Sequence, residues 1–231
     1  MLRKIIYALL CFFLFTSTAS GKSDTPVSVT TKTESQKTPV LSYELNIPLF
    51  SRIKDEKLQR KLNKHMRNEI HSFKYMLQRA AKKAYIEANK NNLPFRPFEG
   101  KVTYQISLNK GRFLSFVLSF YQYTGGAHGM TTWKAYTIDI QNAHELTLED
   151  LFHNGASCKT FITNEITKQI QENPSIYFPN AVQTVQQKNT FSFYLTEEGI
   201  VVFFPLYEIA PYSSGIRTFL IPYATCKPYV K

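Results

Sequence analysis

The chain has 231 residues, of which 43% are hydrophobic and 19% are charged, and its formal net charge at pH 7 is +11. This composition excludes an intrinsically disordered chain and allows one domain, or at most two small ones. Aromatic residues make up 14% of the chain. They indicate a sheet-rich core, because large rings favour strands and bury much apolar area.

Residues 1–20 have the pattern of a cleavable secretory signal peptide. Arg3 and Lys4 form the positive start, an apolar run follows over residues 5–15, and small residues that a signal peptidase accepts come after it. The run is shorter than the ~20 residues of a membrane-spanning helix. An uncleaved anchor and a lipoprotein signal built on Cys11 are the alternatives. We therefore expect an exported protein, periplasmic or secreted, which stays basic because cleavage removes only two basic residues.

The segment 21–39 is rich in Ser, Thr, Lys and Pro and has little that could be buried. We expect a flexible spacer here, because such a composition cannot offset the entropy lost on ordering. Ordered structure is expected to begin at Val40, where apolar and polar residues alternate up to Ile47, and Pro48 is expected to end this strand. Residues 40–231 are then expected to form a single extracytoplasmic domain.

The clearest helix of the sequence covers residues 54–90. Twelve basic and four acidic side chains lie between Arg52 and Lys90, so most of the net charge belongs to this helix. A helix of this length could break near His71 and Ser72. Its apolar residues recur at spacings of three and four and so form one stripe opposite the basic face: Leu58, Leu62, Met66, Ile70, Phe73, Leu77, Ala81, Ala84 and Ala88.

Downstream of this helix, apolar residues alternate with polar ones, which is typical of strands. We expect strands over 101–109, 113–123 and 133–140, a helix over 158–171, and strands over 191–195, 200–204 and 217–221. A long helix followed by such strands predicts an α+β fold. In this fold one long basic helix and one or two shorter helices pack on an antiparallel β-sheet.

Cys158 and Cys226 are the cysteines that remain once the signal peptide is removed. An even number of cysteines in an oxidising compartment favours a disulfide. In the chain-entropy model, a bridge that closes so long a loop contributes ~4 kcal/mol to stability. The alternative is a pair of unrelated buried thiols.

Two groups of motifs carry a resemblance to a known bacterial module. The first is YTGGAHG at 123–129 with ELTLEDLF at 145–152, and the second is FYLTEEGIVVFF at 193–204 with YEIAPY at 207–212. In this combination the chain resembles an extracytoplasmic module of largely unassigned function. That module forms the outer part of the anti-sigma-V factor, where it senses and inhibits lysozyme. A similar module precedes the catalytic domain of some peptidoglycan deacetylases.

Two departures from this family narrow what the resemblance implies. An anti-sigma factor has a cytoplasmic segment and a membrane span before the module, and the deacetylases have a catalytic domain after it. Here we expect only a signal peptide before the module and no deacetylase domain behind it. The resemblance thus implies a stand-alone exported module with a lysozyme-type muramidase as partner. Animal-type lysozymes are themselves strongly basic, so long-range repulsion opposes their encounter with this chain.

The candidate site lies in two loops that are rich in glycine or in aromatic residues. His128 belongs to the Gly-rich loop, and Tyr207, Glu208 and Tyr212 belong to a loop between two strands. Exposed aromatic residues on rigid loops are frequent anchors of interfaces and sugar sites. We expect both loops at the same end of the sheet, where they would form one ligand-binding surface. In the alternative, the tyrosines cover the end of the sheet and the glycines only allow a tight turn.

No catalytic, metal-binding or nucleic-acid-binding motif stands out in the sequence. His128 has no Ser, Cys or carboxylate beside it, and His144 and His153 lack the close spacing of zinc ligands. We therefore expect no catalytic residue, no metal and no cofactor. Nucleic acid is not an expected partner, because no nucleic-acid motif is present and exported proteins rarely meet it.

Three functions follow, in order of preference. The first is a non-enzymatic binding module of the cell envelope that contacts a lysozyme-type protein or cell-wall glycan through His128 and the 207–212 loop. The second is a binder of anionic wall polymer, lipopolysaccharide or another anionic envelope surface through the basic helix, with a merely solvated helix face as the alternative. The third is a peptidoglycan-processing enzyme that uses His128 and Glu208.

Overall fold

The computed structural model of the protein describes residues 26–153 and 155–226 and confirms the α+β class. The signal peptide expected over residues 1–20 lies outside the described residues. The first sheet in the described part has six strands, each hydrogen-bonded to the next: β1 (Ser28–Lys37), β2 (Leu41–Ser51), β3 (Phe98–Lys110), β4 (Phe113–Tyr123), β5 (Met130–Asp139) and β6 (His144–Glu145). A second sheet follows in the same ranges: β7 (Ser192–Leu195), β8 (Gly199–Phe204) and β9 (Arg217–Pro222).

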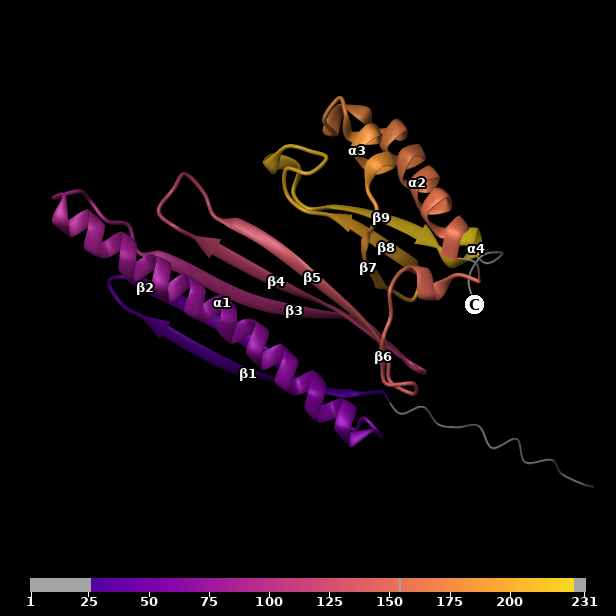
Figure 1. The fold of residues 1–231 in the computed structure, drawn as a ribbon, viewed down its shortest axis with the longest axis horizontal. Coiled ribbons are helices and arrows are strands. Elements are labelled where there is room, and N and C mark those ends of the chain that lie inside the picture. The colour runs from indigo at the N-terminus through magenta and orange to yellow at the C-terminus, as the bar shows by residue number, and fades with distance from the viewer. Residues whose placement is uncertain (1–25, 154, 227–231) are drawn as a thin grey trace, which may run out of the picture.

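The helices lie against the two sheets (Figure 1). They are α1 (Glu56–Lys90), α2 (Gly155–Glu172), α3 (Ala181–Gln187) and the short α4 (Tyr223–Cys226). Helix α1 crosses the first sheet, and α2 and α3 cover the second (Figure 1). Single 3-10 turns lie at η1 (Glu149–Leu151), η2 (Pro174–Ile176) and η3 (Tyr212–Ser214). No helix in the described ranges is long and apolar enough to cross a membrane.

The prediction of a flexible spacer over residues 21–39 is wrong for most of that segment, because residues 28–37 form the edge strand β1. This strand pairs antiparallel with β2, from Ser28 opposite Ser51 to Lys37 opposite Ser42. An edge strand exposes much of its surface, so it needs few apolar residues, and its threonines favour extended backbone. The polar composition that suggested a linker therefore also suits a strand at the border of a sheet.

One pair of neighbours in the first sheet departs from the antiparallel arrangement. β2 and β3 are parallel over Leu41–Leu45 and Phe98–Val102, and α1 supplies the crossover that a parallel pair requires. Strand β2 also continues beyond Pro48, where the sequence predicted its end. Proline is tolerated there because the pairing with β3 stops at Leu45, so Pro48 has a paired strand, β1, on one side only.

Helix α1 is continuous over 35 residues, without the break considered near His71. Asp55 caps its start, since the side chain accepts hydrogen bonds from the backbone N–H groups of Lys57 at 2.8 Å and Leu58 at 3.0 Å. The buried residues on its inner face are those of the predicted apolar stripe: Leu58, Leu62, Met66, Ile70, Leu77 and Ala81. The first four pack against buried residues of the sheet such as Leu114, Phe116 and Leu118, and the last two pack against Leu41 and Phe98.

A polar contact fixes the middle of α1 to strand β5. Glu69 accepts a hydrogen bond from the hydroxyl of Tyr136 and forms an ion pair with Lys134. Burial, and then the hydrogen bond to Glu69, raise the pKa of Tyr136, so its hydroxyl remains a donor at physiological pH. The carboxylate is thus satisfied at the border between the helix and the sheet.

Glu34 joins β1 to α1 at the opposite border of the helix. Its carboxylate lies 3.1 Å from Lys32 Nζ, 3.2 Å from Lys74 Nζ and 3.1 Å from His71 Nε2. Partial burial acts to raise the pKa of Glu34, but the hydrogen bonds from Lys32, Lys74 and His71 outweigh it and lower the pKa to about 2.

Replacing Glu34 tests whether this contact holds β1 in place. Because the folded pKa lies below the unfolded value of 4.5, the carboxylate stabilises the fold above pH 4.5, and this contribution disappears as the pH falls towards 2. We expect Glu34→Gln to lower the free energy of unfolding by about 1 kcal/mol at pH 7, after allowance for solvent screening. Urea unfolding at pH 7 and at pH 2 measures the difference between variant and parent.

The control is Glu56→Gln, which removes the ion pair between Glu56 and Arg60. These side chains are 79% and 69% exposed, respectively. Such an exposed pair contributes little to stability. If the two variants lose the same stability, or if the effect of Glu34→Gln is the same at both pH values, Glu34 does not anchor β1 in this way.

The second sheet packs against the end of the first through β7. The hydroxyl of Ser115 on β4 accepts a hydrogen bond from the backbone N–H of Leu195 at 2.9 Å and is itself 2.9 Å from the Thr137 hydroxyl. Nearby, the ring of Trp133 meets Phe203 edge-on at a centroid distance of 5.7 Å. A buried polar pair and an aromatic pair thus connect the two sheets.

The predicted disulfide between Cys158 and Cys226 is absent, since both thiols are free and buried. Each already has a backbone partner of its own: Cys158 Sγ lies 3.9 Å from the carbonyl oxygen of Leu148, and Cys226 Sγ lies 3.7 Å from that of Tyr223. Both side chains belong to the core beneath α2. Here they act as small apolar residues.

A thiol titration tests this correction. The thiolate is the reactive form of cysteine, and burial, followed by the nearby charge of Glu149, raises the pKa of Cys158 to about 12. Without reductant, we expect protein that lacks residues 1–20 to show two thiols after denaturation and to react slowly when native. A count of zero in the denatured protein would establish the disulfide.

Candidate functional site

Two loops from different sheets meet at one place on the molecule. The β4–β5 loop holds the Gly-rich motif with His128, and the β8–β9 loop holds Tyr207 and Tyr212 (Figure 1). The rings of His128 and Tyr212 are stacked, with centroids 4.0 Å apart and an interplanar angle of 26°. The Tyr212 hydroxyl donates a hydrogen bond to the carbonyl oxygen of Gly129 at 2.9 Å. The sequence prediction that these loops lie together is therefore correct.

The hydrogen bonds of His128 fix the tautomer of its neutral ring. Nδ1 lies 2.9 Å from the carbonyl oxygen of Gly129, which can only accept, so Nδ1 carries the proton. In the neutral ring Nε2 is then an acceptor, and the hydroxyl of Tyr207 faces it at 3.4 Å. One carbonyl therefore orients both stacked rings, and the imidazole is held by both loops.

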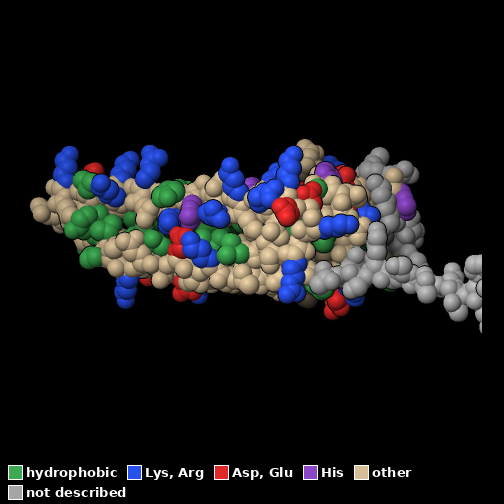
Figure 2. All heavy atoms as spheres, turned by 90° about the horizontal axis from the view of Figure 1, so that it is seen from below, with side chains coloured by type: hydrophobic (Ala, Val, Ile, Leu, Met, Phe, Trp, Pro, Cys, Tyr) green, Lys and Arg blue, Asp and Glu red, His purple; other side chains and the backbone are tan. Residues whose placement is uncertain are grey.

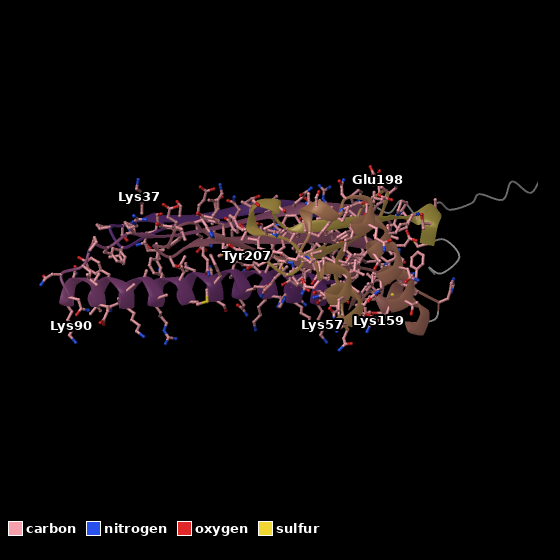
Figure 3. All side chains as sticks on the ribbon, turned by 90° about the horizontal axis from the view of Figure 1, so that it is seen from above. Lys37, Lys57, Lys90, Lys159, Glu198 and Tyr207 are labelled. Carbon is pink, nitrogen blue, oxygen red and sulfur yellow. The ribbon has the colours of Figure 1, made fainter. Side chains whose placement is uncertain are left out.

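Tyr207 is the most exposed member of this cluster, with 48% of its surface accessible. Its ring centroid lies 5.7 Å from that of Tyr212. Its backbone has a φ of 66°, a left-handed conformation that is an outlier for a bulky residue and costs ~1–2 kcal/mol. Tyr207 lies near the middle of the molecule, where the second sheet reaches the first (Figure 3). A strained backbone thus presents an exposed ring beside the stack.

Glu208 does not join this cluster, although it was predicted as a site residue. Its carboxylate pairs with Lys188 at 2.5 Å, and Lys188 Nζ in turn lies 5.6 Å from the centroid of the Phe204 ring. The next residue, Ile209, is buried in the core of the second sheet, and its carbonyl oxygen accepts a hydrogen bond from the Phe178 N–H at 2.9 Å. Glu208 therefore anchors the loop and does not act as a partner of His128.

Further residues of the site were not predicted from the sequence. The Tyr123 hydroxyl donates to the carbonyl oxygen of Gly126 at 3.0 Å, and the Arg96 guanidinium lies 3.5 Å from the same hydroxyl. Tyr121 packs so closely on Gly129 that a Cβ there would lie 2.3 Å from its ring. The sequence does contain a signal for these two tyrosines, because Tyr121 and Tyr123 are two residues apart, lie on the same face of β4 and directly precede the Gly-rich loop.

A shallow hollow of about 500 Å³ extends from Tyr121 over the face of the first sheet that points away from α1. Lys37, in the wall of the hollow, projects from one side of the molecule, and Lys57 and Lys90 of α1 project from the other (Figure 3). Burial, and then the charge of Glu99, raise the pKa of Tyr121, so its hydroxyl stays protonated. The hollow is lined mostly by polar side chains: Ser35, Gln36, Lys37, Ser42, Tyr43, Glu44, Glu99, Gly100, Lys101 and Tyr121.

The close contact at Gly129 yields a test of this geometry. In Gly129→Ala the new methyl group overlaps the ring of Tyr121, which must move aside. We expect a loss of about 1 kcal/mol in the free energy of unfolding, because overpacking forces side chains out of their preferred positions. Urea denaturation followed by circular dichroism measures it. Gly126→Ala is the control, since a Cβ at Gly126 meets no atom within 4 Å. Equal stability of the two variants contradicts the packing described for Tyr121.

Two protein families are similar to parts of the chain. A model described as deacetylase PdaC matches residues 34–131, and a model described as a protein of unknown function, DUF3298, matches residues 149–224. The first part of the chain is thus similar to the PdaC family and the last part to the DUF3298 family, each over less than half of its length. This agrees with the resemblance derived from the motifs at 123–152 and 193–212.

Particular proteins are similar to this chain over most of its length. The chain is 24% identical over 194 residues to the peptidoglycan-N-acetylmuramic acid deacetylase PdaC of Bacillus subtilis, covering 82% of this chain and 39% of that protein. It therefore spans about two fifths of the length of that deacetylase. It is 25% identical over 185 residues to the immunogenic protein MPT64 of Mycobacterium tuberculosis, covering 78% of this chain and 75% of that protein. The name of the first of these relatives refers to a sugar of peptidoglycan.

A solved structure shows the same fold. A DUF3298 family member from Bacteroides fragilis superposes with a TM-score of 0.70 at 20% sequence identity, covering 89% of this chain and 94% of that one. The similarity thus includes both sheets and the helices on them. At this level of identity it describes the architecture and leaves the ligand open.

Proposed function

We propose that this chain is a non-enzymatic, exported binding module of the cell envelope that recognises the glycan strands of peptidoglycan. The observation that carries the proposal is the cluster of His128, Tyr212 and the exposed Tyr207 beside the hollow that begins at Tyr121. Aromatic rings offer flat apolar faces together with polar tips. Sugars present apolar C–H faces and rows of hydroxyl groups, so both parts of this surface suit them.

The polar lining of the hollow supports this choice of ligand. Glu99 and Lys101 on β3 and Glu44 on β2 supply carboxylate and ammonium groups that can bind hydroxyls, and the hollow has the size of an ordinary ligand site. The relative from Bacillus subtilis is a deacetylase named for a peptidoglycan sugar. A module with the same architecture could hold that polymer without modifying it.

A lysozyme-type protein is the other partner that the family resemblance suggests. The chain carries a formal charge of +11, and animal-type lysozymes are also basic, so long-range electrostatics oppose their association. The neutral sugar rings of a glycan meet no such repulsion. The glycan is therefore the better-supported ligand, and lysozyme enters as a second arm of the test.

Calorimetric titration with soluble peptidoglycan fragments tests the proposal. We expect saturable binding that Tyr212→Ala and Tyr207→Ala each weaken at least tenfold, about 1.4 kcal/mol, because they remove rings from the stack. Tyr75→Ala is the matched control, since Tyr75 is 56% exposed but lies on α1. It should leave the affinity unchanged.

A parallel titration with an animal-type lysozyme separates the two partners. If glycan gives no heat of binding and lysozyme binds in a way that depends on Tyr212, the ligand of this site is a protein and not the glycan. If neither tyrosine substitution weakens glycan binding, the glycan site lies elsewhere on the protein.

A further inference from the structure

The exposed apolar side chains of the described residues are concentrated on one element. Six large hydrophobic residues are exposed in this part of the chain, and only Tyr207 lies outside the segment 75–93. Tyr75, Met76 and Ile86 are 56%, 53% and 55% exposed and belong to the C-terminal half of α1. Isolated exposed apolar residues are normal, but a group on one helix indicates an interaction surface.

Basic side chains surround these residues. Arg79, Lys82 and Lys83 line the same open hollow of about 840 Å³ as Tyr75 and Ile86. Among the described residues none of these three cations forms a salt bridge, unlike Arg60 and Lys74 elsewhere on the helix. At the end of the molecule that holds this half of α1, hydrophobic side chains lie among Lys and Arg (Figure 2). We call these six residues, Tyr75, Met76, Arg79, Lys82, Lys83 and Ile86, the apolar–basic patch.

The patch faces away from the body of the protein. Leu77 and Ala81, which lie between its members in sequence, are 1% and 0% exposed and pack on the sheet, so the patch occupies the outer side of the helix. Met76 lies at the border of this side that faces β4 and β5. Side chains such as Lys90 project from this side along α1, and no other described element covers it (Figure 3). A flat partner can therefore reach the whole patch.

We propose that the apolar–basic patch docks this module onto the surface of an anionic lipid bilayer. Cations without a salt bridge are drawn to the anionic head groups close to the surface. Met76 and Ile86 can then enter the boundary between head groups and acyl chains, where the amphipathic ring of Tyr75 also fits. The aliphatic stems of the lysines and the arginine extend the apolar area while their charges stay at the head groups.

The mixture of side chains distinguishes a bilayer from other partners. A soluble polyanion needs only the charges, and these continue along the N-terminal half of α1 through Lys57, Lys61 and Lys64, where no large apolar residue is exposed. A second copy of the chain would bring like charges together, because the patch would face an equally basic surface. Charge complementarity together with exposed apolar residues therefore favours anionic lipid.

Vesicle co-sedimentation of protein that lacks residues 1–20 tests the proposal, since their apolar run would bind lipid by itself. We expect binding to vesicles of phosphatidylcholine with phosphatidylglycerol, little binding to phosphatidylcholine alone, and weaker binding as salt rises. The double variant Met76→Ser/Ile86→Ser should bind the anionic vesicles at least tenfold more weakly and keep the circular dichroism spectrum of the parent, because both side chains are exposed. Lys57→Ser/Lys61→Ser is the control on the same helix and should have a much smaller effect.

Three outcomes would overturn the proposal. They are no binding of the parent protein to anionic vesicles, undiminished binding of Met76→Ser/Ile86→Ser, and self-association of the parent that this variant abolishes, which would identify a second copy as the occupant. A soluble polyphosphate that binds parent and double variant equally well supports a separate role for the apolar residues. Tyr212→Ala should bind vesicles like the parent, so this test is independent of glycan recognition.

Discussion

The packing of α1 across the first sheet is the contact on which the rest of the structure depends. Six buried residues of α1 face a layer of large apolar side chains from β2 to β5. Burial of each such side chain is worth ~1.5–3 kcal/mol before the entropy of ordering is subtracted. Gly100 lets the helix approach closely, since a Cβ there would lie 2.6 Å from Leu77. The same helix connects the parallel strands β2 and β3 and so decides the order of strands in the sheet.

This arrangement gives the two faces of the first sheet different roles. One face is covered by α1, whose outer surface is basic. The other face packs against the second sheet at Ser115 of β4. Its uncovered part is lined mostly by polar side chains and leads to the stack of His128 and Tyr212, which joins a loop of each sheet. The buried contact between Ser115 and Leu195 fixes the two sheets relative to one another. The site is therefore held by rigid elements although its residues lie in loops.

The sequence predicts the elements that bury a regular apolar pattern. The stripe from Leu58 to Ala81 and the apolar run of β4 give their helix and strand almost to the residue. It does not predict β1, because an edge strand of Thr, Ser and Lys buries too little to differ from a linker. Nor does it predict the parallel pairing of β2 and β3, since strand direction follows from the path of α1 and not from local periodicity.

The same limits apply to the candidate site. His128, Tyr207 and Tyr212 could be identified because glycine and exposed aromatic residues are unusual between strands. The position of Glu208 in the loop predicts a place on the ligand surface, but its partner Lys188 lies 20 residues away in sequence. The even number of cysteines predicts a disulfide, whereas in the structure each thiol lies beside a backbone carbonyl in the core. Partners distant in sequence are set by the tertiary structure.

The position of β1 and β2 before α1 in the sequence has a consequence for folding. These strands are joined by a short turn and can pair early, but the free edge of β2 has no partner until β3 is available beyond α1. The N–H and carbonyl oxygen of Val27 are bonded by the side chain of Asn109, 82 residues further on. Contacts of such separation form slowly. In the interval, the threonines and lysines of β1 make this border of the hairpin a poor template for pairing with a second chain, which protects the newly made protein from aggregation.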